Sequence, residues 1–540
     1  MNGCEWWRGA VIYQIYPRSF ADSNGDGIGD LAGIIGKLDY LAGLGVDAVW
    51  LSPIFASPMK DFGYDVADYR AVDPVFGSVD DVRILVSEAH ARNIRVLLDF
   101  VPSHTSDQHP WFRMSRESRD NFYTDWYVWS DPSIDGTPPN NWLSVFGGPA
   151  WTWEPRRQQY YFRTFLAEQP ALNYRAPGLL AAILDEMRFW LELGVDGFRL
   201  DAINACVCDA ELRDNPPAGE PFDPGDSVDN VNPFAMQAHV YSQTRPEITK
   251  LLERFRALMD DYPETTTIGE VASDDSIATA AEYLRGLRLH MAYTFNLLRG
   301  EPTATRVRDV VGRMEAAISD GWPCWSLSNH DVVRAATRWG GPEAPASVAK
   351  VVNAMLLSLR GTICLYQGEE LGLPEADVPY ERLQDPAGRP FWPEYKGRDG
   401  CRTPMPWSSS GIFAEFSAAE PWLPIGEEHR RRAVDIQVAH PGSTLNATRR
   451  FLAWRKKHPA LVEGGLEFVD ASKEVLVFIR TSNAETMICV FNPTGEDAAV
   501  PLPCGTSWTP LDGHGFRGGS VADGVLSLPP ASAWFGSPDD

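Results

Sequence analysis

The stretch GFRLDA at residues 197–202 is one of eight short apolar runs that decide the fold. Each run is followed by polar residues and then by a longer helical pattern, as in a repeated β–α unit. The eight runs are AVIYQIYP (10–17), DAVWLSP (47–53), RVLLDF (95–100), GFRLDA (197–202), TTTIGE (265–270), HMAYTF (290–295), WPCWSLSNHD (322–331) and TICLYQGEE (362–370). Eight parallel strands that alternate with helices predict an α/β fold, a closed (β/α)8 TIM barrel. Periodicity alone also fits an open doubly wound sheet, and that alternative stays open at this point.

The segments between the runs carry helical patterns. LAGIIGKLDYLAGLG, which begins at Leu31, and LLAAILDEMRFWLELG, which begins at Leu179, repeat apolar residues three and four positions apart and end in Gly. Gly after a helical pattern is typical of a helix C-terminus, because it adopts the left-handed conformation readily. These patterns predict the helices that cover the barrel.

Two stretches interrupt the alternation. The residues from Ser103 to about Asn173 contain no helical pattern of normal length and are rich in Trp, Pro, Gly and Asp, which indicates an inserted module after the third strand. The tail from about Leu461 alternates as strands do and predicts an antiparallel β domain. The expected domains are a first part of the barrel at 1–103, an inserted domain B at 104–173, a second part of the barrel at 174–460 with an irregular excursion at 371–448, and a C-terminal β-sandwich at 461–540.

The chain is acidic, with 48 Lys and Arg residues against 73 Asp and Glu residues and a formal net charge of -25. A surface of this charge repels phosphate backbones and anionic lipids, so we expect neither nucleic acid nor membrane partners. The N-terminus has no basic leader followed by an apolar core, and the Cys residues are few for so long a chain. Both features favour a cytoplasmic location. A monomer and a homodimer both stay open.

Polar side chains gather at the ends of the predicted strands, which meet on one open face of a parallel barrel. Cleavage of a glycosidic bond with retention needs one carboxylate that attacks the anomeric carbon and one carboxyl that protonates the leaving oxygen. Asp201 and Glu270 can supply both groups, and Arg199, on the same side of its strand as Asp201, is expected to keep that carboxylate ionised. The strand-end residues are Asp99, His104, Arg199, Asp201, Glu270, Asn329, His330 and Asp331.

Four of these segments, DFVPSHT, GFRLDA, TTTIGE and SNHD, closely resemble the ordered motifs of the α-amylase superfamily, glycoside hydrolase family thirteen. WWRGAVIYQIYPRSFADSNGDGIGDLAGI, DFGYDVADYRAVDPVFG, YQGEELGL and KGRDGCRTPMPW are similar to the α-glucosidase and oligo-1,6-glucosidase branch. The resemblance covers nearly the whole chain, and separated motifs in the correct order are specific where one motif alone would not be.

The resemblance implies the roles of the reactive residues. Asp201 is the nucleophile, Glu270 the general acid/base, and Asp331 the third carboxylate, which holds sugar hydroxyls in the transition state. His104 and His330 then form hydrogen bonds with the same sugar ring, and Arg199 is counted with them among the substrate-binding residues. A His at a strand end is otherwise a satisfied core residue, but two beside three carboxylates favour a substrate-binding role.

The same resemblance implies a pocket that is closed at one end. Asp61, Tyr64 and Arg398 match the positions where this branch surrounds the non-reducing glucose, with Asp61 and Arg398 paired across the far rim, which means exo attack. The alternative is a surface ion pair with no role in specificity. Phe146 and Phe165 resemble aromatic residues that flank this site, although core packing also explains an isolated Phe.

The segment from Asp22 to Asp30 places oxygen-bearing side chains at alternate positions with Gly between them, as loops that bind hard cations do. By analogy with the same loop in this branch, we expect a structural Ca2+ or Mg2+, and no organic cofactor. A plain Asp/Gly turn is the alternative. The expected ligands are Asp22, Asn24, Asp26, the carbonyl of Ile28, and Asp30.

We predict the substrate specificity from two positions at which this sequence departs from particular members of the family. Ala202 follows the nucleophile where members that prefer α-1,6 bonds carry Val, and no RLDRD-like run of the sucrose-isomerising relatives lies between Leu371 and Arg398. We therefore expect an exo-acting retaining α-glucosidase that releases α-glucose from maltose-like α-1,4-glucosides by double displacement, with transglucosylation. The alternatives are a sucrose hydrolase, an oligo-1,6-glucosidase, or a catalytically inactive scaffold member. The presence of all three carboxylates argues against the inactive scaffold.

Overall fold

The computed structural model of the chain describes residues 5–219 and 232–539. Eight parallel strands close a barrel in which β1 pairs with both β2 and β13, so that Val11 lies opposite Ile363. Closure rules out the open doubly wound sheet and confirms the TIM barrel. In order around the barrel the strands are β1 (Val11–Ile15), β2 (Ala48–Leu51), β5 (Arg95–Phe100), β9 (Gly197–Leu200), β10 (Thr266–Val271), β11 (Met291–Thr294), β12 (Trp322–Trp325) and β13 (Thr362–Tyr366).

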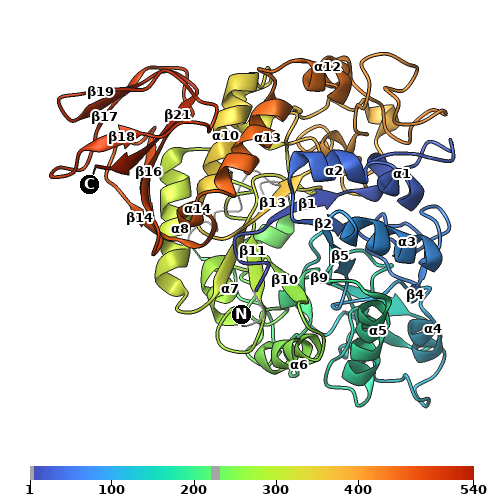
Figure 1. Cartoon of the computed structure of the whole chain (residues 1–540). Helices are drawn as coiled ribbons and strands as arrows, with labels where there is room; N and C mark the ends of the chain where they lie inside the picture. The colour runs from blue at the N-terminus through green and yellow to red at the C-terminus, as the bar shows by residue number, and fades with distance from the viewer. Residues whose placement is uncertain (1–4, 220–231, 540) are drawn as a thin grey trace.

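Helices surround this barrel (Figure 1). The pattern that begins at Leu31 forms two helices instead of one, because Lys37, with a φ of -112° and a ψ of 8°, leaves the helical conformation. The pattern that begins at Leu179 forms one helix that ends at Gly194 with a φ of 104°. The helices around the barrel are α1 (Leu31–Ile35), α2 (Leu38–Leu44), α3 (Val79–His90), α5 (Leu179–Leu193), α6 (Ile248–Asp260), α7 (Ser276–Tyr283), α8 (Ala304–Ala317), α9 (Ala335–Gly340), α10 (Ala346–Ser358) and α13 (Thr444–Arg455). Among the described helices, none combines the length and the apolar character that crossing a bilayer requires.

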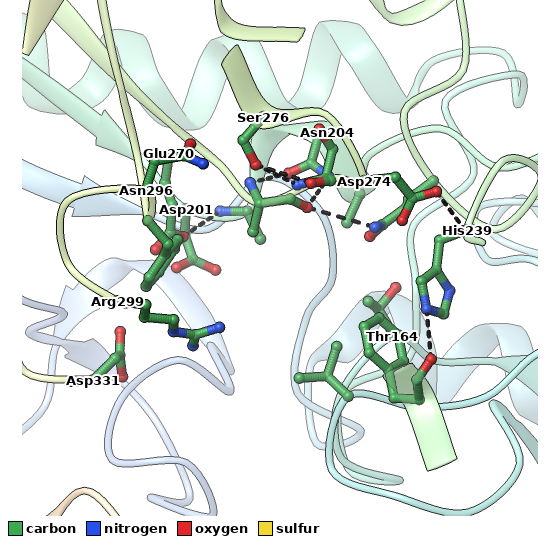
Figure 2. A pocket seen from close by; sticks show the side chains of 18 of the residues that line it. Thr164, Asp201, Asn204, His239, Glu270, Asp274, Ser276, Asn296, Arg299 and Asp331 are labelled. Carbon is green, nitrogen blue, oxygen red and sulfur yellow. Dashed lines mark hydrogen bonds between the residues drawn. The ribbon is translucent and has the colours of Figure 1, made fainter. Parts of the chain in front are cut away.

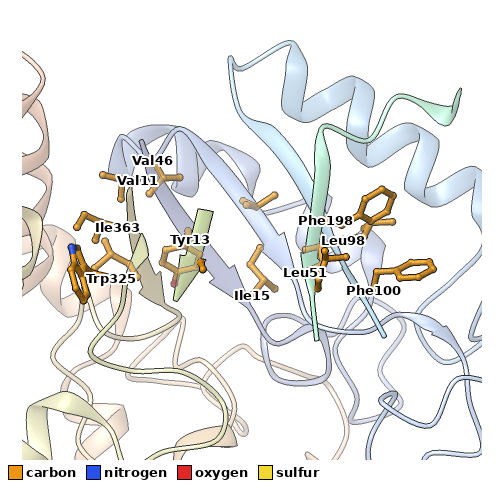
Figure 3. Packing of buried hydrophobic residues seen from close by; sticks show 14 of the residues in the cluster. Val11, Tyr13, Ile15, Val46, Leu51, Leu98, Phe100, Phe198, Trp325 and Ile363 are labelled. Carbon is orange, nitrogen blue, oxygen red and sulfur yellow. The ribbon is translucent and has the colours of Figure 1, made fainter. Parts of the chain in front are cut away.

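The strand residues alternate between two cores, because successive side chains of a strand point to opposite faces. Val11, Tyr13 and Ile15 pack outward in the large core beneath the helices (Figure 3). Ile12 of the same strand packs inside the barrel. Toward the carboxyl ends of the strands the inward positions become polar and buried, as at Gln14, and this change places the site on one face of the barrel.

Two excursions leave the barrel before β9. The first is the short hairpin of β3 (Phe55–Ala56) and β4 (Asp68–Val72). The second, between β5 and α5, contains a three-stranded sheet of β6 (Trp129–Ser130), β8 (Gln159–Phe162) and β7 (Trp151–Glu154), and the helix α4 (Pro110–Glu117). Our expectation of a segment without a helix of normal length missed α4, which has Pro at its first position and is only eight residues long.

The C-terminal part differs from the predicted boundaries at two points. The excursion predicted to stay irregular as far as 448 contains α11 (Glu427–Arg431) and α12 (Val434–Ala439), and the short helix α14 (Pro459–Glu463) crosses the predicted start of the β domain. The β domain itself consists of a five-stranded and a three-stranded antiparallel sheet with an apolar core between them. The first sheet has the order β14 (Gly465–Phe468), β15 (Leu476–Thr481), β16 (Thr486–Asn492), β21 (Ser532–Pro538) and β18 (Trp508–Pro510); the second has β17 (Ala498–Pro501), β20 (Val525–Leu528) and β19 (Ser520–Ala522).

Two buried arginines bind the end of α10, and one of them, Arg480, connects the β domain to the barrel, which it adjoins beside α8, α10 and α13 (Figure 1). Arg480, on β15, donates to the carbonyl of Ser358 at 2.5 Å and to that of Gly464 at 2.8 Å. Arg455 donates to the carbonyl of Leu357 at 2.8 Å. The last carbonyls of α10, which have no partner within their own helix, are thus satisfied by side chains from the C-terminal part of the chain.

Candidate active site

The guanidinium of Arg199 lies at the centre of a cluster of three buried carboxylates. Its Nη1 is 2.8 Å from Asp99 Oδ1 and 2.5 Å from Asp201 Oδ1, and its Nη2 is 2.7 Å from Glu270 Oε1. These residues come from the carboxyl ends of β5, β9 and β10, and all are less than a tenth exposed. The alternation along neighbouring strands therefore brings Asp201 and Glu270 together, as the sequence predicted.

The backbone after β9 holds Glu270 in place. Ala202 adopts a left-handed conformation with a φ of 40°, which turns its N–H toward Glu270 Oε2 at 2.9 Å. The hydroxyl of Tyr293 on β11 donates to the other oxygen at 3.2 Å. Glu270 therefore receives one fixed donor from the residue that follows Asp201, so the two carboxyl groups are positioned relative to each other.

Burial is the largest influence on the protonation of this cluster. It raises the pKa of Asp201 well above its usual range; Arg199 acts in the opposite direction, and the charges of Glu270 and Asp99 add to the rise. Burial likewise raises the pKa of Asp99 to about 7. Arg199 thus favours the ionised form of Asp201, as expected from the sequence, but one guanidinium is divided among three desolvated carboxylates and burial opposes it.

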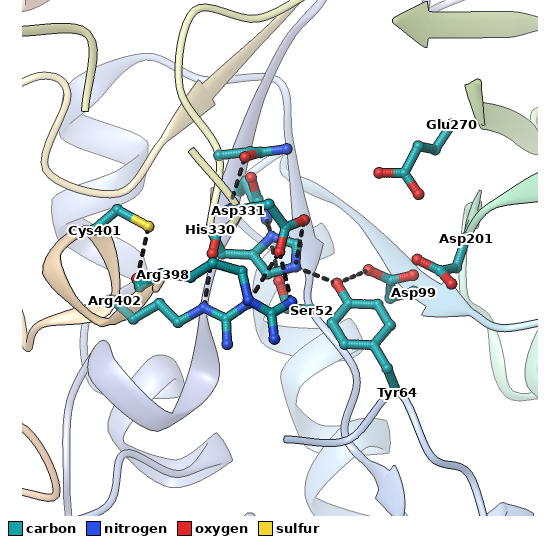
Figure 4. A network of polar contacts seen from close by, with 12 residues as sticks. Ser52, Tyr64, Asp99, Asp201, Glu270, His330, Asp331, Arg398, Cys401 and Arg402 are labelled. Atoms are coloured by element: carbon teal, nitrogen blue, oxygen red, sulfur yellow. Dashed lines mark hydrogen bonds and ion pairs between the residues drawn. The ribbon is translucent and has the colours of Figure 1, made fainter. Parts of the chain in front are cut away.

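A chain of hydrogen bonds runs from the barrel interior to this cluster (Figure 4). Gln14 Nε2 lies 2.8 Å from His330 Nδ1, His330 Nε2 lies 2.6 Å from the hydroxyl of Tyr64, and that hydroxyl donates to Asp99 Oδ2 at 3.1 Å. The rings of Tyr64 and His330 are stacked with centroids 5.3 Å apart. Burial lowers the pKa of His330 to about 3, so the imidazole is neutral. Because the hydroxyl of Tyr64 donates to Asp99, it accepts a hydrogen bond from the Nε2–H of His330.

Asp331, next to His330, faces two arginines. Its Oδ1 is 3.2 Å from Arg398 Nη1 and 3.0 Å from Arg402 Nη2. Burial alone would raise the pKa of Asp331, but His330, Arg398 and Arg402 more than offset it and hold that pKa below its usual range. The ionised form of Asp331 is therefore stabilised by its surroundings.

The predicted pair of Asp61 and Arg398 is present, with Nη2 and Oδ1 2.9 Å apart. Asp61 also accepts from Gln169 Nε2 at 3.2 Å. The side chain of Arg398 lies over the ring of Phe146 at 5.3 Å. Both members of the pair are largely buried, so this is not the exposed surface pair that was the alternative.

His104 and Phe165 complete this end of the site, with ring centroids 5.3 Å apart. His104 Nε2 lies 3.0 Å from the carbonyl of Tyr64, and burial lowers its pKa to about 4. Both predicted histidines are thus neutral groups with defined hydrogen-bond partners.

A cavity of about 980 Å3 joins these groups. Asp201, Glu270 and Asp331 lie on one side of it, and His239 and Asp274 on the other (Figure 2). On that second wall His239 N donates to Asp274 Oδ2 at 2.8 Å. Of the predicted site residues, Asp61, Tyr64, His104, Phe146, Phe165, Asp201, Glu270, Asp331 and Arg398 line the cavity, and Arg199 and His330 lie directly behind them.

Several residues of the site were not predicted. Asp99 was recognised at a strand end but received no role, although it bonds both Arg199 and Tyr64. Asp385 and Gln169 lie in irregular segments, where no periodicity marks a residue as pointing inward. Asp385 stands two residues before Ala387 and thirteen before Arg398, both of which line the cavity, but only the folded loop brings it to Arg398.

The loop at residues 22–30 folds as a series of turns in which its side chains accept backbone N–H groups. Asp22 accepts from Gly25 N at 2.7 Å and from Gly27 N at 2.8 Å, and Asp30 caps α1. In residues 5–219 and 232–539, no three His, Cys, Asp or Glu side chains form a group that could hold a metal ion. The predicted ligands Asp22, Asn24, Asp26, the carbonyl of Ile28, and Asp30 share one loop, and the three carboxylates among them do not form such a group.

The comparison with protein families matches almost the whole chain. The model of the alpha amylase catalytic domain matches residues 14–464, and the model of the maltogenic amylase C-terminal domain matches residues 466–529. The first match contains the barrel from the end of β1 onward and the whole cavity lining except Phe468, which falls within the second.

Among curated relatives, the "Probable alpha-glucosidase" of Rhizobium meliloti (strain 1021) is 51% identical over 535 residues, covering 98% of this chain and 97% of the relative. The "Oligo-1,6-glucosidase" of Heyndrickxia coagulans is 35% identical, covering 92% and 94%. Among solved structures, the alpha-glucosyl transfer enzyme XgtA superposes with a TM-score of 0.97 at 54% identity over 99% of both chains. The trehalulose synthase MutB from Pseudomonas mesoacidophila MX-45 superposes with a TM-score of 0.90 at 31% identity over 99% of both chains.

Proposed function

The chain belongs to the α-amylase family, glycoside hydrolase family thirteen, and on that premise we propose that it is an exo-acting retaining enzyme with transglucosylating activity. That it is a glycoside hydrolase of the α-glucosidase type follows from its relatives. The observation that carries the finer proposal is the contact of Asp201 and Glu270 with neighbouring nitrogens of Arg199. Carboxyl groups held this closely suit the separation of about 5–5.5 Å of a retaining pair, whereas an inverting pair leaves room for water at about 6.5–9.5 Å.

In the proposed first step, Glu270 donates its proton to the glycosidic oxygen while Asp201 attacks C1 of the glucose. The C1–O bond breaks and an ester forms between the glucose and Asp201. In the second step Glu270 takes a proton from water or from an acceptor hydroxyl, which attacks C1 and releases Asp201. Water gives α-glucose, and an acceptor alcohol gives a new α-glucoside.

Exo attack is supported by the closed end of the cavity. The pair of Asp61 and Arg398, with Phe146 against Arg398, leaves the non-reducing glucose no continuation beyond this end. Asp331 has its negative charge beside the same subsite, where it suits hydroxyl groups that become more acidic in an oxocarbenium-like transition state. His104 and Tyr64 offer further polar atoms there.

Retention is tested by the anomeric form of the first product. Proton NMR of p-nitrophenyl α-glucoside hydrolysis should show α-glucose first, with the β anomer appearing only at the rate of mutarotation. Replacement of Asp201 by Ala should abolish the reaction. Initial formation of β-glucose would refute the double displacement, and full activity of Asp201→Ala would refute the assignment of the nucleophile and favour an inactive scaffold with a contaminating hydrolase.

Transfer to acceptors is supported by the similarity to the alpha-glucosyl transfer enzyme XgtA. Incubation with maltose and a simple alcohol should yield the alkyl α-glucoside beside free glucose, and products containing free glucose alone would refute transfer. For the donor we propose maltose-like α-1,4-glucosides on the basis of Ala202. The oligo-1,6-glucosidase relative favours the second candidate, cleavage of α-1,6 bonds, so initial rates on maltose, isomaltose and sucrose decide between the candidates.

A structural divalent cation in the loop at residues 22–30 remains part of the proposal. It is supported by the alternating oxygen side chains of this loop. Binding would require Asp22 to exchange backbone donors for the ion. The loop contributes no residue to the cavity lining, and the reaction above assigns no step to the ion.

A further inference from the structure

Arg398 makes more contacts with Asp385 than with either carboxylate of the glucose subsite. Asp385 Oδ2 accepts from Arg398 Nε at 3.0 Å and from the backbone N of Arg398 at 2.6 Å, and Asp385 Oδ1 accepts from Nη2 at 2.8 Å. Asp61 and Asp331 each receive a single hydrogen bond from Arg398, at 2.9 and 3.2 Å. The orientation of the guanidinium is therefore set mainly by Asp385.

Asp385 itself cannot touch a substrate in the cavity. It is 1% exposed and is not part of the cavity lining, whereas Arg398 and Ala387 are. Its Oδ1 also accepts from the backbone N of Ala387 at 3.2 Å, and its own N–H donates to Asp399 Oδ2 at 3.0 Å. The side chain of Asp385 is thus held by the backbone N–H of Ala387, and its own backbone N–H is held by the carboxylate of Asp399.

We propose that Asp385 is a positioning residue of the glucose subsite, which holds Arg398 in the orientation that closes the far end of the cavity. The inference rests on the proposed function, since it assigns a role within the same site. Asp61 and Asp331 face the sugar and lie in different parts of the chain, so each draws the guanidinium toward itself. Asp385 binds Nε and one hydrogen of Nη2, so that Nη1 is directed to Asp331 and the second hydrogen of Nη2 to Asp61.

The same carboxylate closes the neck of a loop that lines the cavity. Between Asp385 and Arg398 the chain carries Phe391 and Tyr395, both part of the lining. At the neck, Gly397 has a φ of 80°, and a Cβ there would lie 2.8 Å from Gly388 Cα and 2.9 Å from Asp385 Oδ2. The two ends of the loop therefore meet without side chains between them, and Asp385 provides the charged contact that joins them.

Asp385→Asn tests this role, because it keeps the size of the side chain, removes its charge and places an NH2 group against the donors of Arg398. We expect KM for p-nitrophenyl α-glucoside and the inhibition constant of glucose to rise together by at least about tenfold, as loss of a buried charge pair predicts. The value of kcat should change by less than about threefold, since Asp385 does not touch the reacting atoms. Asp385→Glu, which restores the charge with a longer side chain, should recover part of the affinity for both ligands.

Asp377→Asn is the matched control. Asp377 pairs with Lys396 of the same loop at 2.6 Å, but its side chain is 80% exposed, so its loss should leave KM and the glucose inhibition constant unchanged. Wild-type KM and glucose inhibition in Asp385→Asn would overturn the inference, as would a fall of kcat at constant KM. If Asp385→Asn does not fold, Asp385→Glu carries the same comparison, and an unchanged KM and glucose inhibition constant in it would overturn the inference. A wild-type protein that neither cleaves α-glucosides nor responds to glucose would instead refute the proposed function.

Discussion

Replacement of Arg199 by Met should move the acid limb of the pH–activity profile to higher pH. Arg199 is fully buried, and its two terminal nitrogens contact Asp99, Asp201 and Glu270. Met has a similar length but no charge and no donors. The three carboxylates would keep their burial, which raises the pKa of Asp201, and lose the contact that lowers it.

The size of the shift follows from the loss of a buried ion pair, which costs about 3–5 kcal/mol when one partner is removed. At about 1.4 kcal/mol for each factor of ten, this loss corresponds to a factor of about 100 to 10,000, and it acts by raising the pKa of Asp201. Asp201 attacks as a carboxylate, so a higher pKa leaves less of it ionised at a given pH. At neutral pH the rate should fall by about 100- to 10,000-fold and recover partly as pH rises.

The assay is kcat/KM for p-nitrophenyl α-glucoside between pH 4 and pH 10, with circular dichroism at each pH to show that the variant remains folded. Arg199→Lys is the matched variant: it keeps a positive charge but not the fork that reaches several carboxylates at once, so its shift should be smaller. A folded Arg199→Met protein whose acid limb coincides with that of the wild type would refute the reasoning.

Three further outcomes are expected. Glu270→Gln should lower kcat on maltose by about 100- to 10,000-fold but slow the cleavage of α-glucosyl fluoride much less, because fluoride leaves without a proton; an equal loss on both substrates would contradict its role as general acid. Ala202→Val should raise the ratio of kcat/KM for isomaltose over maltose by about tenfold or more, the usual effect of one or two methyl groups in a pocket, and an unchanged ratio would show that residue 202 does not set linkage preference. Elemental analysis after desalting should find about one Ca2+ or Mg2+ per wild-type chain and none in Asp22→Ala, as a loop with oxygen ligands predicts, whereas equal metal contents would end the proposal of a cation there.

The barrel was predictable because each strand lies between a helical pattern and a polar strand end, and such repeats are read from neighbouring residues alone. GFRLDA and TTTIGE place Asp201 and Glu270 at equivalent strand ends, so their convergence followed from the closure of the barrel. The break between α1 and α2 lies at Lys37, within an otherwise continuous pattern, and α4 is too short for its periodicity to stand out. Such details depend on tertiary packing, which overrides local propensity.

The electrostatic balance of the site was less accessible from the sequence. The positive charge of Arg199, two residues before Asp201, is visible in the sequence. The burial that raises the pKa of Asp201 against the effect of this charge is a property of the folded molecule. Likewise, Asp385 lies in a segment without periodicity, and its partner Arg398 was recognised only through a motif. Residues that act through another side chain leave no local pattern, because their position is defined by how a loop closes.

Arg480, which binds the end of α10, makes the β-sheet domain a condition for an intact barrel. Shortening the chain before Arg480 would remove the donor to the carbonyl of Ser358 and would also expose the face of α10 that packs against β16 and β21. Apolar surface exposed in this way destabilises the barrel. Protease digestion should therefore not yield a stable catalytic fragment, and shortened expression versions are best avoided. The barrel and the β-sheet domain should therefore unfold in a single thermal transition.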